Sequence, residues 1–154
     1  MTLVIAAGVA LGLFWPWHDN ARPAVPAGQE VVLHRSSDRH FYADADVDGK
    51  SIHFLVDTGA SATALTEDDA RKLGLNPDRQ QYELIGQGAS GLVRGQFVKL
   101  HEIRVGDIRQ PDATVAIVEG STVSLLGQPF LEQLDEIVIR KDSMLLRAGP
   151  GSQD

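Results

Sequence analysis

The chain has 154 residues, a formal net charge of −7 at pH 7 and no cysteine. Hydrophobic residues make up 43% of it and charged residues 23%, a composition typical of a globular protein with room for one ordinary domain. The acidic balance, without any cluster of Lys and Arg, argues against a nucleic-acid-binding surface. The lack of cysteine excludes disulfides, a thiolate nucleophile and a cysteine-based zinc site.

The N-terminus carries an uncharged apolar run. Residues 2–17, TLVIAAGVALGLFWPW, end in two tryptophans, which are enriched at membrane interfaces. The run is shorter than the ~20 residues of a full span, and it lacks the basic start and the small-residue cleavage site of a secretory signal. We expect residues 1–17 to be an apolar membrane segment acting as a signal-anchor, with a cleaved signal and a buried core helix as the alternatives.

The segments on either side of the expected domain are rich in small and polar residues. Residues 18–30 contain Pro23, Pro26 and Gly28, a composition that buries no core and predicts a flexible Pro-rich linker. Residues 148–154 are expected to form a flexible C-terminal tail. The folded domain is therefore predicted over residues 31–147.

Short, alternating patterns predict mostly strands. HFYADADV and KSIHFLV flank Asp48-Gly49, one of the strongest local signals for a β-hairpin. TEDDARKLGL follows, with Thr66 as N-cap and Gly74 just past the end, so a short helix is expected. Its acidic run, Glu67, Asp68 and Asp69, is interpreted as a solvated helix start favoured by the helix dipole.

The second half of the chain predicts further strands. QYELI, GLVRGQFVKLHEIRVG and ATVAIVE read as strands, and the glycine-rich GQGASG between the first two predicts a loop tip that can move. SLLGQPFLEQL predicts a strand, a glycine turn and a short helix, and EIVIR and SMLLR a closing pair of strands. The expected class is all-β with one or two short helices.

The stretch HFLVDTGASATALT places Asp57 at the end of an apolar strand. A charge there costs free energy unless hydrogen bonds or a shared proton compensate it, so such positions are often functional. The alternative is an ordinary turn in which Thr58 and Gly59 only shape the loop. The chain contains a single Asp-Thr-Gly.

Three segments, FLVDTGASATALT, LIGQGASG and SLLGQPFLEQL, resemble the retropepsin-like aspartic proteases, most closely the small bacterial, membrane-anchored type. The resemblance covers about residues 40–147 and implies a single-lobe acid protease fold with its active site at a two-fold dimer interface. It implies that Asp57 is catalytic, that Thr58 bonds to the partner loop, that Gly59 admits substrate backbone, and that Ala60 and Ser61 line the adjoining subsite.

The resemblance also implies a flap and an active-site brace. The flap residues are Ile85, Gly86, Gln87 and Gly88; the brace residues are Leu125, Leu126 and Gly127. Ser61 stands where many viral relatives carry an acidic residue. The helical insert at residues 66–74 also departs from the viral pattern and is expected to decorate the outside.

The implied function is an aspartic endopeptidase that hydrolyses peptide bonds in proteins or peptides. The reaction needs two close carboxylates that share one proton, and this chain supplies a single Asp-Thr-Gly. The water is therefore expected to be activated by two Asp57 carboxylates, one from each chain of a homodimer. No cofactor and no metal are expected. The bacterial resemblance implies a single-pass inner-membrane anchor with the protease domain in the periplasm.

Two other classes of function remain open. The first is a non-catalytic peptide-binding or dimerisation module. The second is a calcium-stabilised module built on DADVDG at residues 44–49, although Leu55 stands where a calcium loop needs a bidentate glutamate. The histidines show no metal-ligand spacing. The glycine-rich segment lacks the Lys-Ser/Thr ending of a phosphate loop, and an ordinary hairpin tip is its alternative to a flap.

Overall fold

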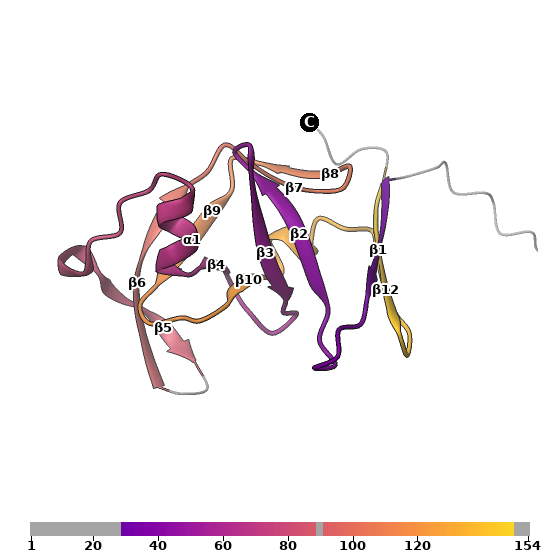
Figure 1. Ribbon diagram of the computed structural model, residues 1–154, viewed down its shortest axis with the longest axis horizontal. Helices are drawn as coiled ribbons and strands as arrows, with labels where there is room; N and C mark the ends of the chain where they lie inside the picture. Colours follow the sequence, from indigo (N-terminus) through magenta and orange to yellow (C-terminus); the bar gives the residue numbers. More distant parts are fainter. Residues whose placement is uncertain (1–28, 89–90, 150–154) are drawn as a thin grey trace, which may run out of the picture.

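The computed structural model describes residues 29–88 and 91–149 (Figure 1). The expected membrane segment, residues 18–28 of the linker and residues 150–154 of the tail lie outside these ranges. Within them, no helix combines the length and the apolar character needed to cross a membrane.

The described residues form two sheets and two short helices, so the predicted all-β class is confirmed. A nine-stranded sheet has the order β5-β6-β9-β4-β10-β3-β2-β7-β8, and a three-stranded sheet has the order β1-β12-β11. The strands are β1 Gln29–His34, β2 Tyr42–Val47, β3 Lys50–Val56, β4 Thr63–Leu65, β5 Glu83–Gly88, β6 Gly91–Lys99, β7 Glu102–Val105, β8 Ile108–Pro111, β9 Thr114–Val118, β10 Ser124–Leu126, β11 Glu136–Ile139 and β12 Ser143–Ala148. The helices are α1 Glu67–Lys72 and α2 Gln128–Leu131, with a 3-10 turn, η1, at Arg79–Gln81.

The predicted Asp-Gly hairpin joins β2 to β3. Asp48 and Gly49 have φ angles of 47° and 84°, the positive values that a two-residue hairpin turn of this kind requires. Two of the three aspartates of the suspected calcium loop bind backbone: Asp46 accepts from the Gly49 amide at 3.1 Å and Asp48 from the Glu102 amide at 2.9 Å. The third, Asp44, lies 2.7 Å from His53 Nδ1. Among the described residues there is no cluster of three or more metal-ligating side chains.

The terminal sheet corrects the predicted domain limits of residues 31–147. Gln29 pairs with Ala148, and the Arg147 guanidinium bonds to Glu30 at 2.6 Å and also to Glu136. The domain therefore begins before Val31 and includes the buried Ala148. Composition alone does not predict this, because each end is ordered by pairing with the other end, which is more than 100 residues away in the sequence.

One hydrophobic core joins the two sheets and α2. Its largest fully buried side chains include Phe54 of β3, Leu126 of β10, Phe130 of α2 and Leu146 of β12. In Figure 1 the β5–β6 hairpin projects at one end of the molecule, and β1 and β12 lie at the other. Because Phe54 and Leu126 are buried in it, the core fixes β3 and β10, the inner strands that lead to the Asp57 loop.

Helix α1 begins as predicted, with one difference. The Thr66 hydroxyl accepts from the Asp69 amide at 3.0 Å, and Gly74 follows the helix with a φ of +87°. Glu67, however, is only 9% exposed, so its interpretation as part of a solvated first turn is wrong. Its carboxylate is buried because Arg79 and Tyr82, from the next segment, bond to it.

Candidate active site

Asp57 lies where two parallel strands end together. Strand β3 pairs in parallel with β10, so that Val56 stands opposite Leu126, and the Asp57 amide donates to the Leu126 carbonyl at 3.1 Å. Phe54 of β3 and Leu126 of β10 are fully buried in the core, which fixes the position of both strands. The Asp57 side chain, partly buried, is consequently presented at a defined point beyond the strand end.

The loop after Asp57 folds around the carboxylate. The Gly59 amide donates to Asp57 Oδ1 at 2.8 Å, and the Ala60 amide donates to the Asp57 carbonyl at 3.2 Å. A Cβ atom on Gly59 would stand 3.3 Å from Asp57 Oδ1, a tight contact. Asp57 does form a turn, as the alternative interpretation held, but the same turn leaves its carboxylate at a cavity.

The segment predicted as a brace contacts the loop closely through its backbone. The Gly127 amide donates to Thr63 Oγ1 at 3.3 Å, and the Gln128 amide donates to the Ala60 carbonyl at 2.8 Å. A Cβ atom on Gly127 would stand 2.3 Å from the Ala62 carbonyl oxygen, closer than any real contact. Only glycine allows this approach of the brace to the loop.

A side chain adds to this brace. Gln128 Nε2 donates to the Thr58 carbonyl at 2.5 Å, from the first residue of α2. Sequence reasoning did not single out Gln128. Its place after the Leu-Leu-Gly segment was a signal, but only the structure shows that its amide reaches back across the loop.

A cavity of about 470 Å³ opens at Asp57. The loop contributes Gly59, Ala60 and Ser61 to its lining, and the brace contributes Leu125. All four predicted flap residues line it from β5: Ile85, Gly86, Gln87 and Gly88. The structure thus brings three segments, distant in sequence, around one carboxylate.

Some predicted residues lie behind or beside the cavity, and others were missed. Thr58 is exposed, and Leu126 and Gly127 are buried behind the loop; none of these three lines the cavity. The lining residues that sequence reasoning missed are Ala62, Ala64, Val93, Phe97, Ala116 and Val118. They lie in or beside strands, where alternation shows which residues share a face but not which face meets the site.

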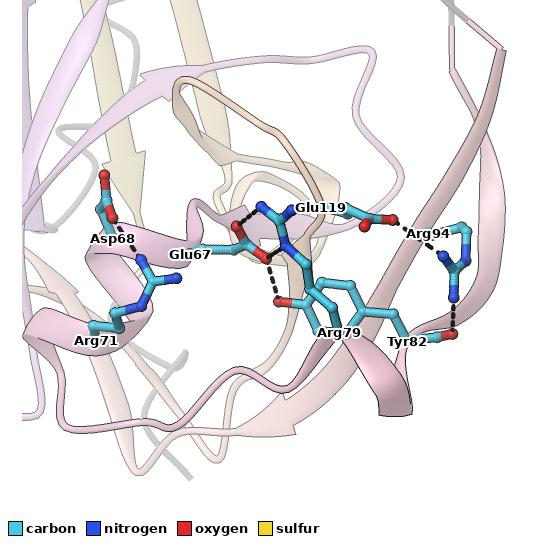
Figure 2. A network of polar contacts seen from close by, with 7 residues as sticks. All are labelled: Glu67, Asp68, Arg71, Arg79, Tyr82, Arg94 and Glu119. Atoms are coloured by element: carbon cyan, nitrogen blue, oxygen red, sulfur yellow. Dashed lines mark hydrogen bonds and ion pairs between the residues drawn. The ribbon is translucent and has the colours of Figure 1, made fainter.

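A polar network lies at the base of the flap (Figure 2). Glu67 accepts from Arg79 Nε at 2.8 Å and Nη2 at 2.5 Å, and from the Tyr82 hydroxyl at 3.1 Å. Hydrogen bonds from Arg79 lower the pKa of Glu67 to about 2 against the effect of burial. Burial and the bond to Glu67 raise the pKa of Tyr82 to about 12. The Glu67 carboxylate is therefore ionised and Tyr82 protonated across ordinary pH.

Comparison with known sequences points to one family. Residues 43–133 match the family described as "gag-polyprotein putative aspartyl protease". The chain is 44% identical over 121 residues to an "Uncharacterized protein in cobV 5'region" of Sinorhizobium sp., covering 77% of this chain and 52% of that protein. It is 32% identical over 153 residues to "Uncharacterized protein RP867" of Rickettsia prowazekii (strain Madrid E), covering 94% of this chain and 66% of that protein. The chain thus spans between about half and two thirds of these relatives' length.

Solved structures agree. A retropepsin-like aspartic protease from Rickettsia conorii superposes with a TM-score of 0.65 at 31% identity, covering 78% of this chain and 91% of that one. The EIAV protease complexed with the inhibitor HBY-793 superposes with a TM-score of 0.54 at 16% identity, covering 68% and 97%, which shows likeness of fold alone. With a family match over more than half its length and a solved relative above 30% identity, the chain belongs to the retropepsin-like aspartic proteases.

Proposed function

We propose that the protein is a homodimeric aspartic endopeptidase whose active site contains one Asp57 from each chain. The observation that carries this proposal is the position of Asp57. Among the described residues that line the 470 Å³ cavity, it is the only carboxylate. Hydrolysis by direct attack of water needs two carboxyl groups, one to accept a proton and one to donate it. A two-fold axis beside the loop supplies the second from an identical chain.

The paired carboxyl groups would share one proton, because two like charges about 3 Å apart do not both ionise easily. The ionised Asp57 accepts a proton from water as the water oxygen bonds to the peptide carbonyl carbon. The protonated Asp57 of the second chain donates its proton to the carbonyl oxygen. When the diol collapses, one proton passes to the nitrogen, another returns to the pair, and the C–N bond breaks.

The surrounding residues fit roles in binding. Thr58 and Ser61 are exposed beside the carboxylate, where a partner loop and a substrate backbone would lie. Ser61 offers a hydrogen bond without a charge, and the flap faces it across the cavity. We assign Thr58 to the contact between the two loops, Gly59, Ala60 and Ser61 to substrate backbone, and residues 85–88 to covering the substrate.

We further propose that residues 1–17 anchor the protein in the inner membrane as a signal-anchor, with residues 18–28 as the tether and the domain in the periplasm. The uncharged run with its two tryptophans supports an anchor, and the periplasmic placement rests on the resemblance to small bacterial, membrane-anchored proteases. Anchoring two chains in one membrane raises their effective concentration and so favours the dimer.

A cleavage assay tests the proposed activity. Wild type, Asp57→Asn and Asp107→Asn, an exposed aspartate in another turn, are compared on fluorescently labelled unfolded casein from acidic to neutral pH. The full chain is assayed in detergent, and residues 28–154 are assayed as a soluble protein. We expect cleavage that Asp57→Asn abolishes and Asp107→Asn retains, with a rate per chain that rises with enzyme concentration. A stable dimer that cleaves nothing at any pH would favour the peptide-binding module instead.

A further inference from the structure

The insert between the active-site loop and the flap is more than a surface decoration. It comprises α1, η1 and the turn between them, and its two ends hold residues that bond to each other: Glu67 opens α1, and Arg79 opens η1. Both guanidinium bonds reach the same carboxylate, a bidentate geometry that fixes orientation as well as distance. The insert therefore closes on itself at an ion pair whose carboxylate is buried and whose guanidinium is largely exposed.

From this pair the network continues into the flap. Tyr82 immediately precedes β5, is 4% exposed, and donates its hydroxyl proton to Glu67. Its carbonyl accepts from Arg94 Nη2 of β6 at 2.8 Å, and Arg94 Nη1 lies 3.4 Å from Glu119 Oε2, just past β9 (Figure 2). Both strands of the flap hairpin are thus bound at their base.

The bound residues alternate with residues of the cavity wall. Val93 lines the cavity and its neighbour Arg94 does not; Val118 lines it and its neighbour Glu119 does not. Successive side chains on a strand point to opposite faces. The network consequently contacts one face of these strands, and their opposite face forms part of the wall of the cavity at Asp57.

The other end of the network is tied to the strand beside the active-site loop. The Thr66 amide, next to Glu67, donates to Ser124 Oγ at 3.0 Å, and Ser124 Oγ donates to Asp69 at 2.6 Å. Ser124 belongs to β10, which pairs with β3, the strand that ends at Asp57. A continuous set of bonds therefore links the support of the catalytic loop with the base of the flap.

We propose that Glu67, Arg79 and Tyr82 act as a flap-base clamp: positioning residues that set the distance between the flap and Asp57 and hence the affinity for substrate. This inference rests on the proposed protease function. Tyr82 ties the flap to the ion pair, and the ion pair ties both to α1. Loss of the clamp lets the flap adopt more orientations, so substrate binding weakens while the carboxylates and their chemistry stay in place.

The test uses three clamp variants and a matched control on the full chain. Arg79→Gln removes the ion pair, Arg79→Lys keeps a charge without the bidentate geometry, and Tyr82→Phe removes one hydroxyl. Arg71→Gln breaks the exposed pair between Arg71 and Asp68 within α1, a pair that forms no hydrogen bond to the described residues of the flap. Circular dichroism and thermal melting confirm that each variant folds.

We expect Arg79→Gln to raise KM for labelled casein roughly threefold to tenfold with kcat changed less than about twofold. Arg79→Lys and Tyr82→Phe should show smaller rises, and Arg71→Gln none. Hydrogen exchange at the amides of residues 83–88, measured without substrate, should accelerate in the same order. This order is a signature that a general loss of stability would not produce, because such a loss would reach strands far from the flap as well.

The two readouts separate failure of the clamp from failure of the proposed function. If wild type cleaves casein and folded Arg79→Gln leaves both KM and flap exchange unchanged, the clamp is wrong and the protease assignment stands. If exchange accelerates as expected but wild type never cleaves, the mechanical part of the clamp is supported and the enzymatic proposal is overturned. An equal rise in KM in Arg71→Gln also contradicts the clamp.

Discussion

The two sides of the cavity are held in different ways. The loop that carries Asp57 is held mainly by backbone: amides of Gly59, Ala60 and Gln128 bond to it, and Gly127 packs where no side chain fits. The flap base is held by side chains, namely the ion pair and hydroxyl that meet at Glu67. The Asp57 loop thus tolerates little change in shape, whereas the attachment of the flap base depends on single side chains.

The largest effect on stability is expected from Gly127→Ala. The new Cβ would stand 2.3 Å from the Ala62 carbonyl oxygen, so the brace and the loop must separate. We expect a loss of more than about 2 kcal/mol in the free energy of unfolding, measured by urea denaturation, together with loss of cleavage. Gly86→Ala is the control, since nothing lies within 4 Å of its Cβ position. Equal stabilities of the two variants would show that the brace is not closely packed.

The next largest effect is a pH dependence of stability that comes from Glu67 at the flap base. The pKa of Glu67 is lowered from 4.5 to about 2 in the folded protein, so the unfolded chain binds more protons as pH falls. The ionised Glu67 carboxylate therefore stabilises the folded protein fully above about pH 4.5, and this stabilisation is lost as pH falls through 2. Glu67→Gln should cost about 1–3 kcal/mol near neutral pH, because Arg79 is largely exposed and partly screened by water.

Urea denaturation at several pH values checks this prediction. The stability difference between wild type and Glu67→Gln should shrink steadily from about pH 4.5 towards 2. Asp68→Asn, at an almost fully exposed neighbouring position, is the control and should show a small difference throughout. A difference for Glu67→Gln that stays constant down to the lowest pH would mean that the carboxylate is not the group responsible.

A smaller effect on stability is expected from Gln128→Ala, which removes a side-chain bond from the otherwise backbone-held loop. The bond is exposed, so the cost should be at most about 1 kcal/mol. The Thr58 carbonyl would lose its partner beside Asp57, and kcat should fall roughly threefold to tenfold as the loop loses orientation. Glu132→Ala, at the other end of α2, serves as the control. Unchanged kcat would show that the backbone alone orients the loop.

The smallest effect on stability accompanies a complete loss of activity. Asp57→Asn keeps an oxygen that accepts from the Gly59 amide, so the loop turn should persist and the melting temperature should change little. The amide neither accepts a proton from water nor shares one with a partner, so cleavage should fall below detection. A large drop in melting temperature would instead make Asp57 a structural residue.

The sequence by itself determined the local elements and the central site residue. Asp48-Gly49 allowed only a tight hairpin, Thr66 capped a helix, and the end of an apolar strand put Asp57 at a boundary. These features depend on neighbours within a few residues, where backbone sterics and local hydrogen bonds decide the outcome. The flap and the brace were placed by motifs that accompany Asp57 in the family the chain resembles.

Only the tertiary structure decided which distant side chains meet. Glu67 looked like a solvated helix start but is buried, because Arg79 and Tyr82 fold back onto it. Gln29 and Ala148 looked like parts of flexible ends but pair in one sheet. In each case the contact joins residues that are not neighbours in the sequence. Its energy depends on strand register and on the burial of side chains, and neither can be predicted from the residues next to it in the chain.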